Sequence, residues 1–322
     1  MTNRSVLLDE KGAATYKNPT TLWMAWLGML LLSRLPQIIA LELFGVDFGE
    51  QILWLWLAAG IILIGSTFVW LALRPLRGFF VVMTAVYGAT VLVNGLVGTD
   101  GWQSWFGGTE TAWAIRFFGE RLGVVLIALL VTAVLFLMGQ SRRHIFLVKG
   151  NWQAETGLQL PGRPQPLAWG VVGLGVGLAL ALLFGWGLTQ MNTGLYLDWQ
   201  QLVLLAPFVL LFALLNAFGE EMAFRAGPLS QLWLVIGEKQ AVWLTAVWFG
   251  PGHYYGGIPA GAMGAVMSGL LGLLLGKVML ETKGIVLPIC MHLLLDTAIY
   301  AFLAMTAVRR ASLWQAAGER SV

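Results

Sequence analysis

The residues best suited to chemistry lie in the last third of the chain, inside stretches that are otherwise apolar. Two adjacent carboxylates, Glu220 and Glu221, follow a run that is largely apolar from Leu202 onward. Adjacent residues point about 100° apart on a helix, so the two carboxylates cannot share one task on one face. Glu221 and Arg225 are spaced i, i+4 with the acid first, the order that favours an ion pair. Glu220 is then left without a local partner.

Two of the three histidines of the chain lie in the same region. His253 follows Phe249 by four residues, in a glycine-rich segment, and His292 and Asp296 are spaced i, i+4 in the last apolar run. An aspartate beside a histidine can fix the orientation and tautomer of the imidazole. A charged group at the bilayer centre costs about 2.5–3.5 kcal/mol, so each polar group indicates a functional site. Each group also has a purely structural alternative. The Glu220–Glu221 pair could mark a helix end at the membrane surface, and His253 could be a loop histidine. His292 and Asp296 could form a helix–helix hydrogen bond.

These residue types suffice for hydrolysis of an amide by water. A glutamate removed from bulk solvent can take a proton from water near neutral pH, and one histidine can hold that water. The second histidine, oriented by Asp296, can donate to the carbonyl oxygen as negative charge develops there. No GxSxG motif is present, and a helix would direct Cys290 about 200° away from His292, which follows it by two residues, so a serine or cysteine nucleophile has little support. Glu220, His253 and His292 could instead hold a catalytic zinc ion; no HExxH motif supports it, and the sequence leaves both mechanisms open.

Long apolar runs must position these residues, and they predict a membrane protein. Of the 322 residues, 58% are hydrophobic and 11% are charged, whereas a soluble domain carries roughly 25% charged residues. We predict an all-α, polytopic membrane helix bundle of about 8–9 transmembrane helices, because runs of about 20 apolar residues without alternation fit helices and no barrel. The lipid bilayer is therefore the expected surrounding, and the low charge argues against a nucleic-acid partner. The candidate spans cover residues 22–44, 51–73, 79–97, 122–138, 168–189, 201–224, 240–253, 260–280 and 285–306.

The distribution of Lys and Arg predicts the orientation of the bundle. If successive spans alternate from a cytoplasmic N-terminus, most of the 19 Lys and Arg residues fall on the cytoplasmic side. The long loop 139–167 is then cytoplasmic. This loop separates two predicted regions. Residues 1–150 comprise the N-terminal transmembrane helices and the cytoplasmic loop, and residues 151–322 form a catalytic transmembrane bundle. Span 240–253 is short enough to be a partial crossing.

Three separate segments bring the key side chains to similar depth. A rise of 1.5 Å per residue places Glu220, His253 and His292 about 14, 20 and 12 Å from the cytoplasmic surface. A purely structural role is plausible for each residue considered separately. It is less plausible for all three, because they share a similar depth.

The order and spacing of these residues resemble the signature motifs of the CPBP family. This family includes the Ras-converting CAAX prenyl endopeptidases and the bacteriocin-processing or immunity (Abi) proteins. The resemblance covers about 200–306, and the matching motifs are Glu220-Glu221-x-x-x-Arg225, Phe249-x-x-x-His253 and His292-x-x-x-Asp296.

The resemblance implies an intramembrane endopeptidase that acts on a membrane-anchored or lipidated peptide. It implies that Glu220 is the base and that His253 and His292 are catalytic, with Asp296 at a position that is often Asn in the family. Glu221, Arg225 and Phe249 would support them. We expect an integral protein of the bacterial cytoplasmic membrane with a cytoplasmic N-terminus, with no cofactor required unless zinc is used.

Two other functions compete with this reading. A transporter or proton relay would also use buried Glu, His and Asp side chains. Its marks would be inverted repeats and broken helices in both halves, and the sequence predicts a break only around 250–257. A non-proteolytic membrane scaffold of the same family would not need all three motifs intact.

Overall fold

Helices make up the regular structure of the chain, as the sequence predicts. The computed structural model describes residues 18–108, 111–162, 164–191 and 199–319, and these ranges contain no β-strand beyond one isolated bridge. The first half contains α1 (Pro19–Leu31), α2 (Leu35–Phe44), α3 (Gln51–Val69), a 3₁₀ turn (Arg74–Leu76), α4 (Arg77–Val97), α5 (Asp100–Phe106) and α6 (Trp113–Leu137). The second half contains α7 (Trp169–Met191), α8 (Trp199–Glu220), a π-helix (Glu221–Ala226), α9 (Gly227–Ile236), α10 (Glu238–Gly252), α11 (Ala262–Thr282) and α12 (Val286–Glu319).

Seven helices of the described chain are long and apolar enough to cross a membrane, or eight if α1 and α2 count as one bent span. The polytopic helix bundle expected from the hydropathy is therefore confirmed. Candidate span 240–253 corresponds to α10, which has 15 residues and is not among the spans. At 1.5 Å per residue it is about 22 Å long, shorter than a hydrocarbon core of about 30 Å. Candidate span 201–224 is predicted to end near Glu220 and Glu221. In the structure the span continues past them and runs from Gln200 to Ile236.

The first span is broken, which the sequence did not predict. Helices α1 and α2 meet at an angle of 55°. Pro36 lies in the first turn of α2 and lacks an amide proton, so the helix of α1 cannot continue through it. The expectation of an unbroken N-terminal half is thus wrong. Arg34 lies at this bend, where its guanidinium bonds Gln37 and lies over the Trp56 ring, and it does not line the cavity described below.

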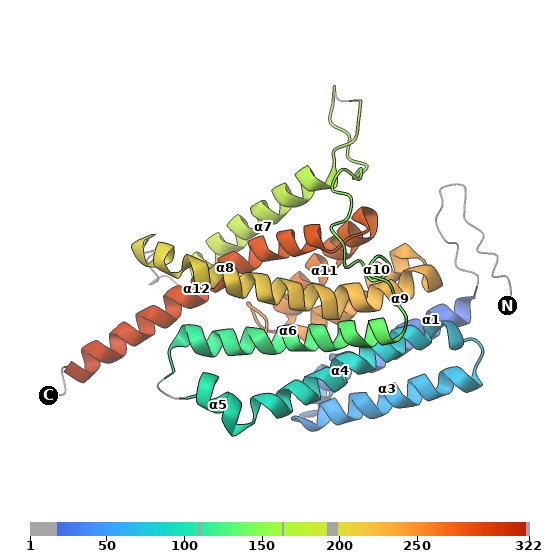
Figure 1. Cartoon of the computed structure of the whole chain (residues 1–322), viewed down its shortest axis with the longest axis horizontal. Coiled ribbons are helices and arrows are strands. Elements are labelled where there is room, and N and C mark those ends of the chain that lie inside the picture. Colours follow the sequence, from blue (N-terminus) through green and yellow to red (C-terminus); the bar gives the residue numbers. More distant parts are fainter. Residues whose placement is uncertain (1–17, 109–110, 163, 192–198, 320–322) are drawn as a thin grey trace.

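The positively charged connections gather at one end of the bundle. Thr21 at the start of α1 bonds the carbonyl of Ala72 in the α3–α4 connection. The amide of Asn151, in the α6–α7 loop, donates to Thr282 at the end of α11. Lys283, just after α11, pairs with Glu238 at the start of α10. Helix α12 then runs to the opposite end of the long axis (Figure 1). This arrangement agrees with the alternation assumed in counting the charges.

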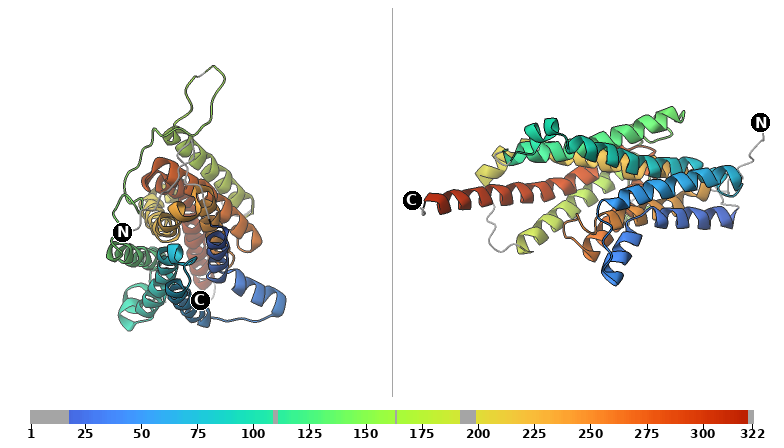
Figure 2. Two further views of the ribbon diagram at one scale, coloured as in Figure 1. Left: turned by 90° about the vertical axis from the view of Figure 1, so that its right-hand side faces the viewer. Right: turned by 90° about the horizontal axis from the view of Figure 1, so that it is seen from below.

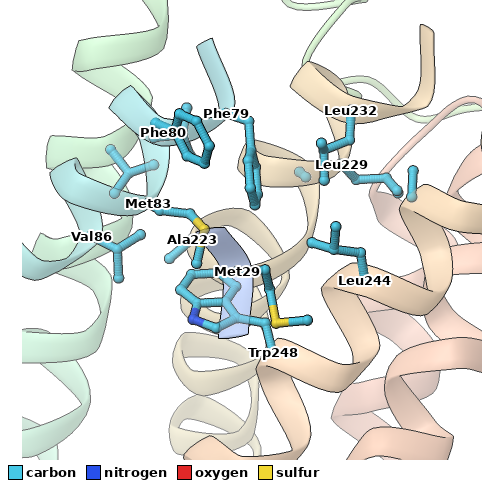
Figure 3. Close-up of a cluster of buried hydrophobic side chains, with 14 of the residues drawn as sticks. Met29, Phe79, Phe80, Met83, Val86, Ala223, Leu229, Leu232, Leu244 and Trp248 are labelled. Carbon is cyan, nitrogen blue, oxygen red and sulfur yellow. The ribbon is translucent and has the colours of Figure 1, made fainter. Parts of the chain in front are cut away.

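One hydrophobic core joins the N-terminal and C-terminal halves of the chain and includes side chains of the segment that carries the first motif. It combines side chains of α1 and α4 with side chains of the π-helix, α9 and α10 (Figure 3). Ala223 of the π-helix is completely enclosed in this core, among Met29, Met83 and Trp248. Helix α8 packs between α6 and α12, and these helices run along the length of the bundle in Figure 1, which the left view of Figure 2 shows from one end. The core therefore fixes the segment that carries the two glutamates.

Candidate active site

The two adjacent glutamates lie where the sixth candidate span changes its helical geometry. Glu220 is the last residue of α8, and Glu221 is the first residue of the π-helix that ends at Ala226. A π-helix forms i→i+5 hydrogen bonds, so its turn is wider than an α-turn and its side chains change angular register. Short π segments inside α-helices are frequent at functional sites. Here the wider turn begins at Glu221, directly after Glu220.

Glu221 and Arg225 form a buried ion pair, as their spacing predicts. The guanidinium of Arg225 donates to Glu221 Oε1, and both side chains are at most 2% exposed. The same oxygen of Glu221 lies 2.9 Å from Nδ1 of His292. Arg225 also lies against the ring of Phe249, with its guanidinium carbon 4.7 Å from the ring centroid. The Glu221–Arg225 pair of the first motif therefore contacts Phe249 of the second motif and His292 of the third.

His253 lies at the end of α10, immediately after Gly252. Its Nδ1 is 3.2 Å from the carbonyl oxygen of Phe249, and the two rings are 4.5 Å apart between centroids. A carbonyl only accepts, so Nδ1 carries a proton and Nε2 faces away from α10. The chain folds back closely here, because a Cβ atom at Gly257 would collide with the carbonyl oxygen of His253. Pro251 is accommodated in the last turn of α10 and does not prevent this presentation.

The carboxylate of Glu220 lies between the two histidines. Its Oε2 is 3.8 Å from Nε2 of His253 and 3.7 Å from Nε2 of His292. Glu220 is 17% exposed and His253 27% exposed, whereas His292 is buried. The predicted convergence of three segments is therefore present. These distances exceed direct hydrogen bonds and are of the size that one bridging water spans.

Asp296 lies beside His292 but does not make the hydrogen bond that we expected from it. Its Oδ1 is 3.6 Å from His292 Nε2, on the ring edge that also faces Glu220. The hydrogen bond that fixes the imidazole comes instead from Glu221 at Nδ1. The i, i+4 spacing of His292 and Asp296 allows contact but does not choose which nitrogen is used. Glu221 gains this contact from the π-helix, whose geometry no sequence pattern revealed.

A cavity of about 1170 Å³ opens beside this cluster. Glu220, His253, His292 and Asp296 all line it, whereas Glu221 and Arg225 do not. Most of its wall is apolar and comes from α7, α11 and α12, including Leu180, Leu183, Phe184, Met267, Leu271 and Ile299. The cavity therefore presents a small polar patch inside a space that suits an apolar or membrane-embedded ligand.

Three polar residues at the cavity were not singled out by the sequence reasoning. Arg121 on α6 donates to Asn216 on α8 at 2.7 Å and to the hydroxyl of Tyr300 on α12 at 2.9 Å. Asn216 in turn donates to Asp296 at 3.0 Å. Helical spacing gave a signal for two of them, since Asn216 precedes Glu220 by four residues and Tyr300 follows Asp296 by four. Arg121 had no such signal, because it comes from the distant N-terminal half.

Glu220, His253 and His292, the residues that could hold zinc, lie farther apart than the ligands of a tetrahedral zinc site. The described residues contain no group of three or more His, Cys, Asp or Glu side chains arranged to hold a metal ion. Glu220 Oε2 lies 3.7 and 3.8 Å from the two Nε2 atoms, and these distances are wider than about 3.3 Å, the spacing that Zn–ligand bonds of about 2.0–2.1 Å give in a tetrahedral site.

The fold and the cavity define an integral membrane helix bundle with a buried acid–histidine centre. Residues 202–298 match the family model of Rce1-like type II CAAX prenyl endopeptidases. This segment holds all three motifs, and the match confirms the resemblance to the CPBP family. The match supports an intramembrane endopeptidase, a hydrolase that works within the lipid bilayer. No curated protein and no solved structure matches the chain.

Proposed function

We propose that this protein hydrolyses peptide bonds of a membrane-anchored or lipidated substrate with a water molecule activated by Glu220. The observation that carries the proposal is the position of the Glu220 carboxylate, 3.7–3.8 Å from two histidine Nε2 atoms at the wall of a membrane-level cavity. Residues 202–298, which match an endopeptidase family, contain every member of this cluster. We further propose that residues 151–322 supply the catalytic helices and that the N-terminus is cytoplasmic.

The hydrogen bonds of the two histidines support a different role for each ring. Nδ1 of His253 donates to Phe249, so its Nε2 can accept a proton of the nucleophilic water, while Glu220 accepts the other. Nδ1 of His292 donates to the carboxylate of Glu221, and in the proposal His292 carries a second proton on Nε2. That proton is donated to the substrate carbonyl oxygen, which becomes negatively charged in the transition state.

The proposed reaction balances without any other group. Glu220 takes a proton as the water oxygen bonds the carbonyl carbon, which gives a tetrahedral intermediate. The oxyanion is stabilised by Nε2–H of His292. Glu220 then returns its proton to the leaving nitrogen as the C–N bond breaks, and the products are a carboxylic acid and an amine. Glu221 and Arg225 hold His292 in place and do not meet the substrate, because neither lines the cavity.

The test is a comparison of two matched Glu→Gln variants. Full-length protein in liposomes is incubated with a panel of lipidated peptides, and the products are identified by mass spectrometry. Glu220→Gln removes the base with almost no change of volume and is expected to abolish cleavage while the protein still folds. Glu120→Gln, at a half-exposed position on α6, is expected to cleave like the wild type. Wild-type turnover by Glu220→Gln would end this assignment.

A further inference from the structure

A chain of polar contacts runs from the N-terminal half to the acid–histidine cluster. Arg121 projects from α6, and its Nη1 donates both to Oδ1 of Asn216 and to the hydroxyl of Tyr300. Its guanidinium is also 5.0 Å from the ring centroid of Phe117 and 5.7 Å from that of Tyr300. The side chain is 21% exposed, so this chain of contacts lies mostly inside the protein, and Arg121 lines the same cavity as Glu220.

Arg121 determines which way the amide of Asn216 points. A guanidinium only donates, so the atom of Asn216 that it meets at 2.7 Å must be the oxygen. The amide nitrogen of Asn216 is then directed at Oδ2 of Asp296, 3.0 Å away. Without Arg121 the two orientations of the amide would differ little in shape, and one of them would set its oxygen against the carboxylate.

The orientation of Asp296 matters because its other oxygen faces the cluster. While Oδ2 accepts from Asn216, Oδ1 lies 3.6 Å from Nε2 of His292. A helix fixes the backbone of Asp296 but leaves the rotation of its carboxylate to its partners. Among the interactions of the described residues, the only hydrogen bond to this carboxylate comes from Asn216. The position of Oδ1 beside His292 thus depends on the hydrogen bond from Asn216 of α8, and Arg121 of α6 orients the amide that donates it.

We propose that Arg121 and Asn216 are positioning residues, which act in series to hold Asp296 in its orientation beside His292. This inference rests on the proposed function and adds two residues outside the three motifs to it. A small displacement matters in such a site, since a shift of about 1 Å in a reacting group can cost roughly 10²-fold in rate.

The ion pair of Arg121 with its neighbour does not account for its placement. Nη2 is 3.6 Å from Glu120, whose side chain is 52% exposed, and exposed pairs of this kind contribute little. The two shorter contacts of Arg121 both go to oxygens of uncharged groups on other helices. A role in binding substrate is the main competitor, since Arg121 lines the cavity. The two roles differ in whether KM or kcat changes.

A double-mutant cycle separates action in series from independent effects. Arg121→Met keeps most of the apolar stem and removes the donors, and Asn216→Ala removes the link. Each is expected to lower kcat about 10–100-fold, with KM changed by less than about threefold. If the two residues act in series, the double variant loses at most about threefold more than the worse single variant. Arg116→Met is the matched control, because Arg116 lies on the same helix and its hydrogen bonds to described residues go to the exposed backbone carbonyls of Gly108 and Thr111.

Three further variants keep the test decisive if a variant fails to fold. Arg121→Lys retains a donor and the charge but loses the planar guanidinium, so its kcat is expected to lie between that of Arg121→Met and that of the wild type. Asn216→Asp sets two carboxylates against each other and is expected to lose activity about 10-fold or more. Adding Asp296→Asn to it restores one donor facing one acceptor, and this combination is expected to recover to within about threefold of Asp296→Asn alone.

Each outcome has a defined meaning, with melting temperature in detergent recorded for every variant. Multiplicative losses in the double variant would overturn the inference, and so would a raised KM at unchanged kcat. Failure of the Asn216 and Asp296 exchange to recover activity would also overturn it. Activity that survives Glu220→Gln would instead refute the proposed function, so the two failures are distinguishable.

Discussion

Removal of Arg225 should destabilise the protein as well as inactivate it. Arg225 is among the largest completely buried side chains, and its partner Glu221 is fully enclosed. Arg225→Ala would leave the carboxylate of Glu221 inside the protein with one remaining contact, Nδ1 of His292. Oε2 of Glu221 already has no hydrogen-bond partner among the described residues, so nothing else is placed to compensate the charge.

The size of the effect follows from burial. Breaking a buried ion pair by removing one partner costs about 3–5 kcal/mol. The lost contact between the guanidinium and Phe249 adds roughly 0.5–2 kcal/mol. With an unfolding entropy of about 2.1 cal/mol/K per residue, 1 kcal/mol corresponds to about 1.5 °C in melting temperature for 322 residues, so we expect a decrease of about 5–10 °C.

A second i, i+4 pair in the same protein provides the control. Lys277 and Glu281 form an ion pair on α11, but their side chains are 50% and 32% exposed. Surface pairs contribute about 0–1 kcal/mol, so Lys277→Ala should lower the melting temperature by at most a few degrees. Glu221→Gln combined with Arg225→Met removes both charges at once, and stability should recover although activity should not, because a neutral amide replaces the carboxylate at His292.

The assay follows intrinsic fluorescence during heating in detergent, which suits a chain with 16 Trp residues. Cleavage of a lipidated peptide is measured on the same preparations. An unchanged melting temperature with lost activity in Arg225→Ala would refute the structural role and make Arg225 a substrate-binding group. An equal decrease in Lys277→Ala would show that burial is not the cause.

Two predictions concern the last helix. Asp296→Asn keeps an oxygen that can accept from Asn216, and Glu221 still orients His292, so kcat should fall by less than about tenfold; a loss of 10³-fold would show that the negative charge itself is required. His292→Ala removes the proposed oxyanion donor and should cost about 10²–10³-fold in kcat, with activity of the wild type insensitive to a chelator. Elemental analysis checks the second prediction, since stoichiometric zinc that is present in active wild type and lost in His292→Ala would contradict it.

The sequence by itself determined the class of protein and the residues that meet. Long apolar runs require helices because the bilayer offers no partners for free backbone groups, and this is a local property that hydropathy reports. Polar residues in such runs are costly, so Glu220, His253 and His292 stood out individually. The i, i+4 spacing of Glu221 and Arg225 also predicted their ion pair correctly, since both members belong to one helical segment.

Only the tertiary structure decided how these residues divide their contacts. The hydrogen bond that His292 donates to Glu221 joins two helices, and Glu221 lies at the start of a π-helix, a rare backbone geometry that packing in the core must stabilise. Arg121 reaches Asn216 across 95 positions of sequence, and no local spacing encodes such a contact. Hydropathy and spacing are properties of one segment, whereas the hydrogen-bond partner of a buried side chain is chosen by all the segments that enclose it.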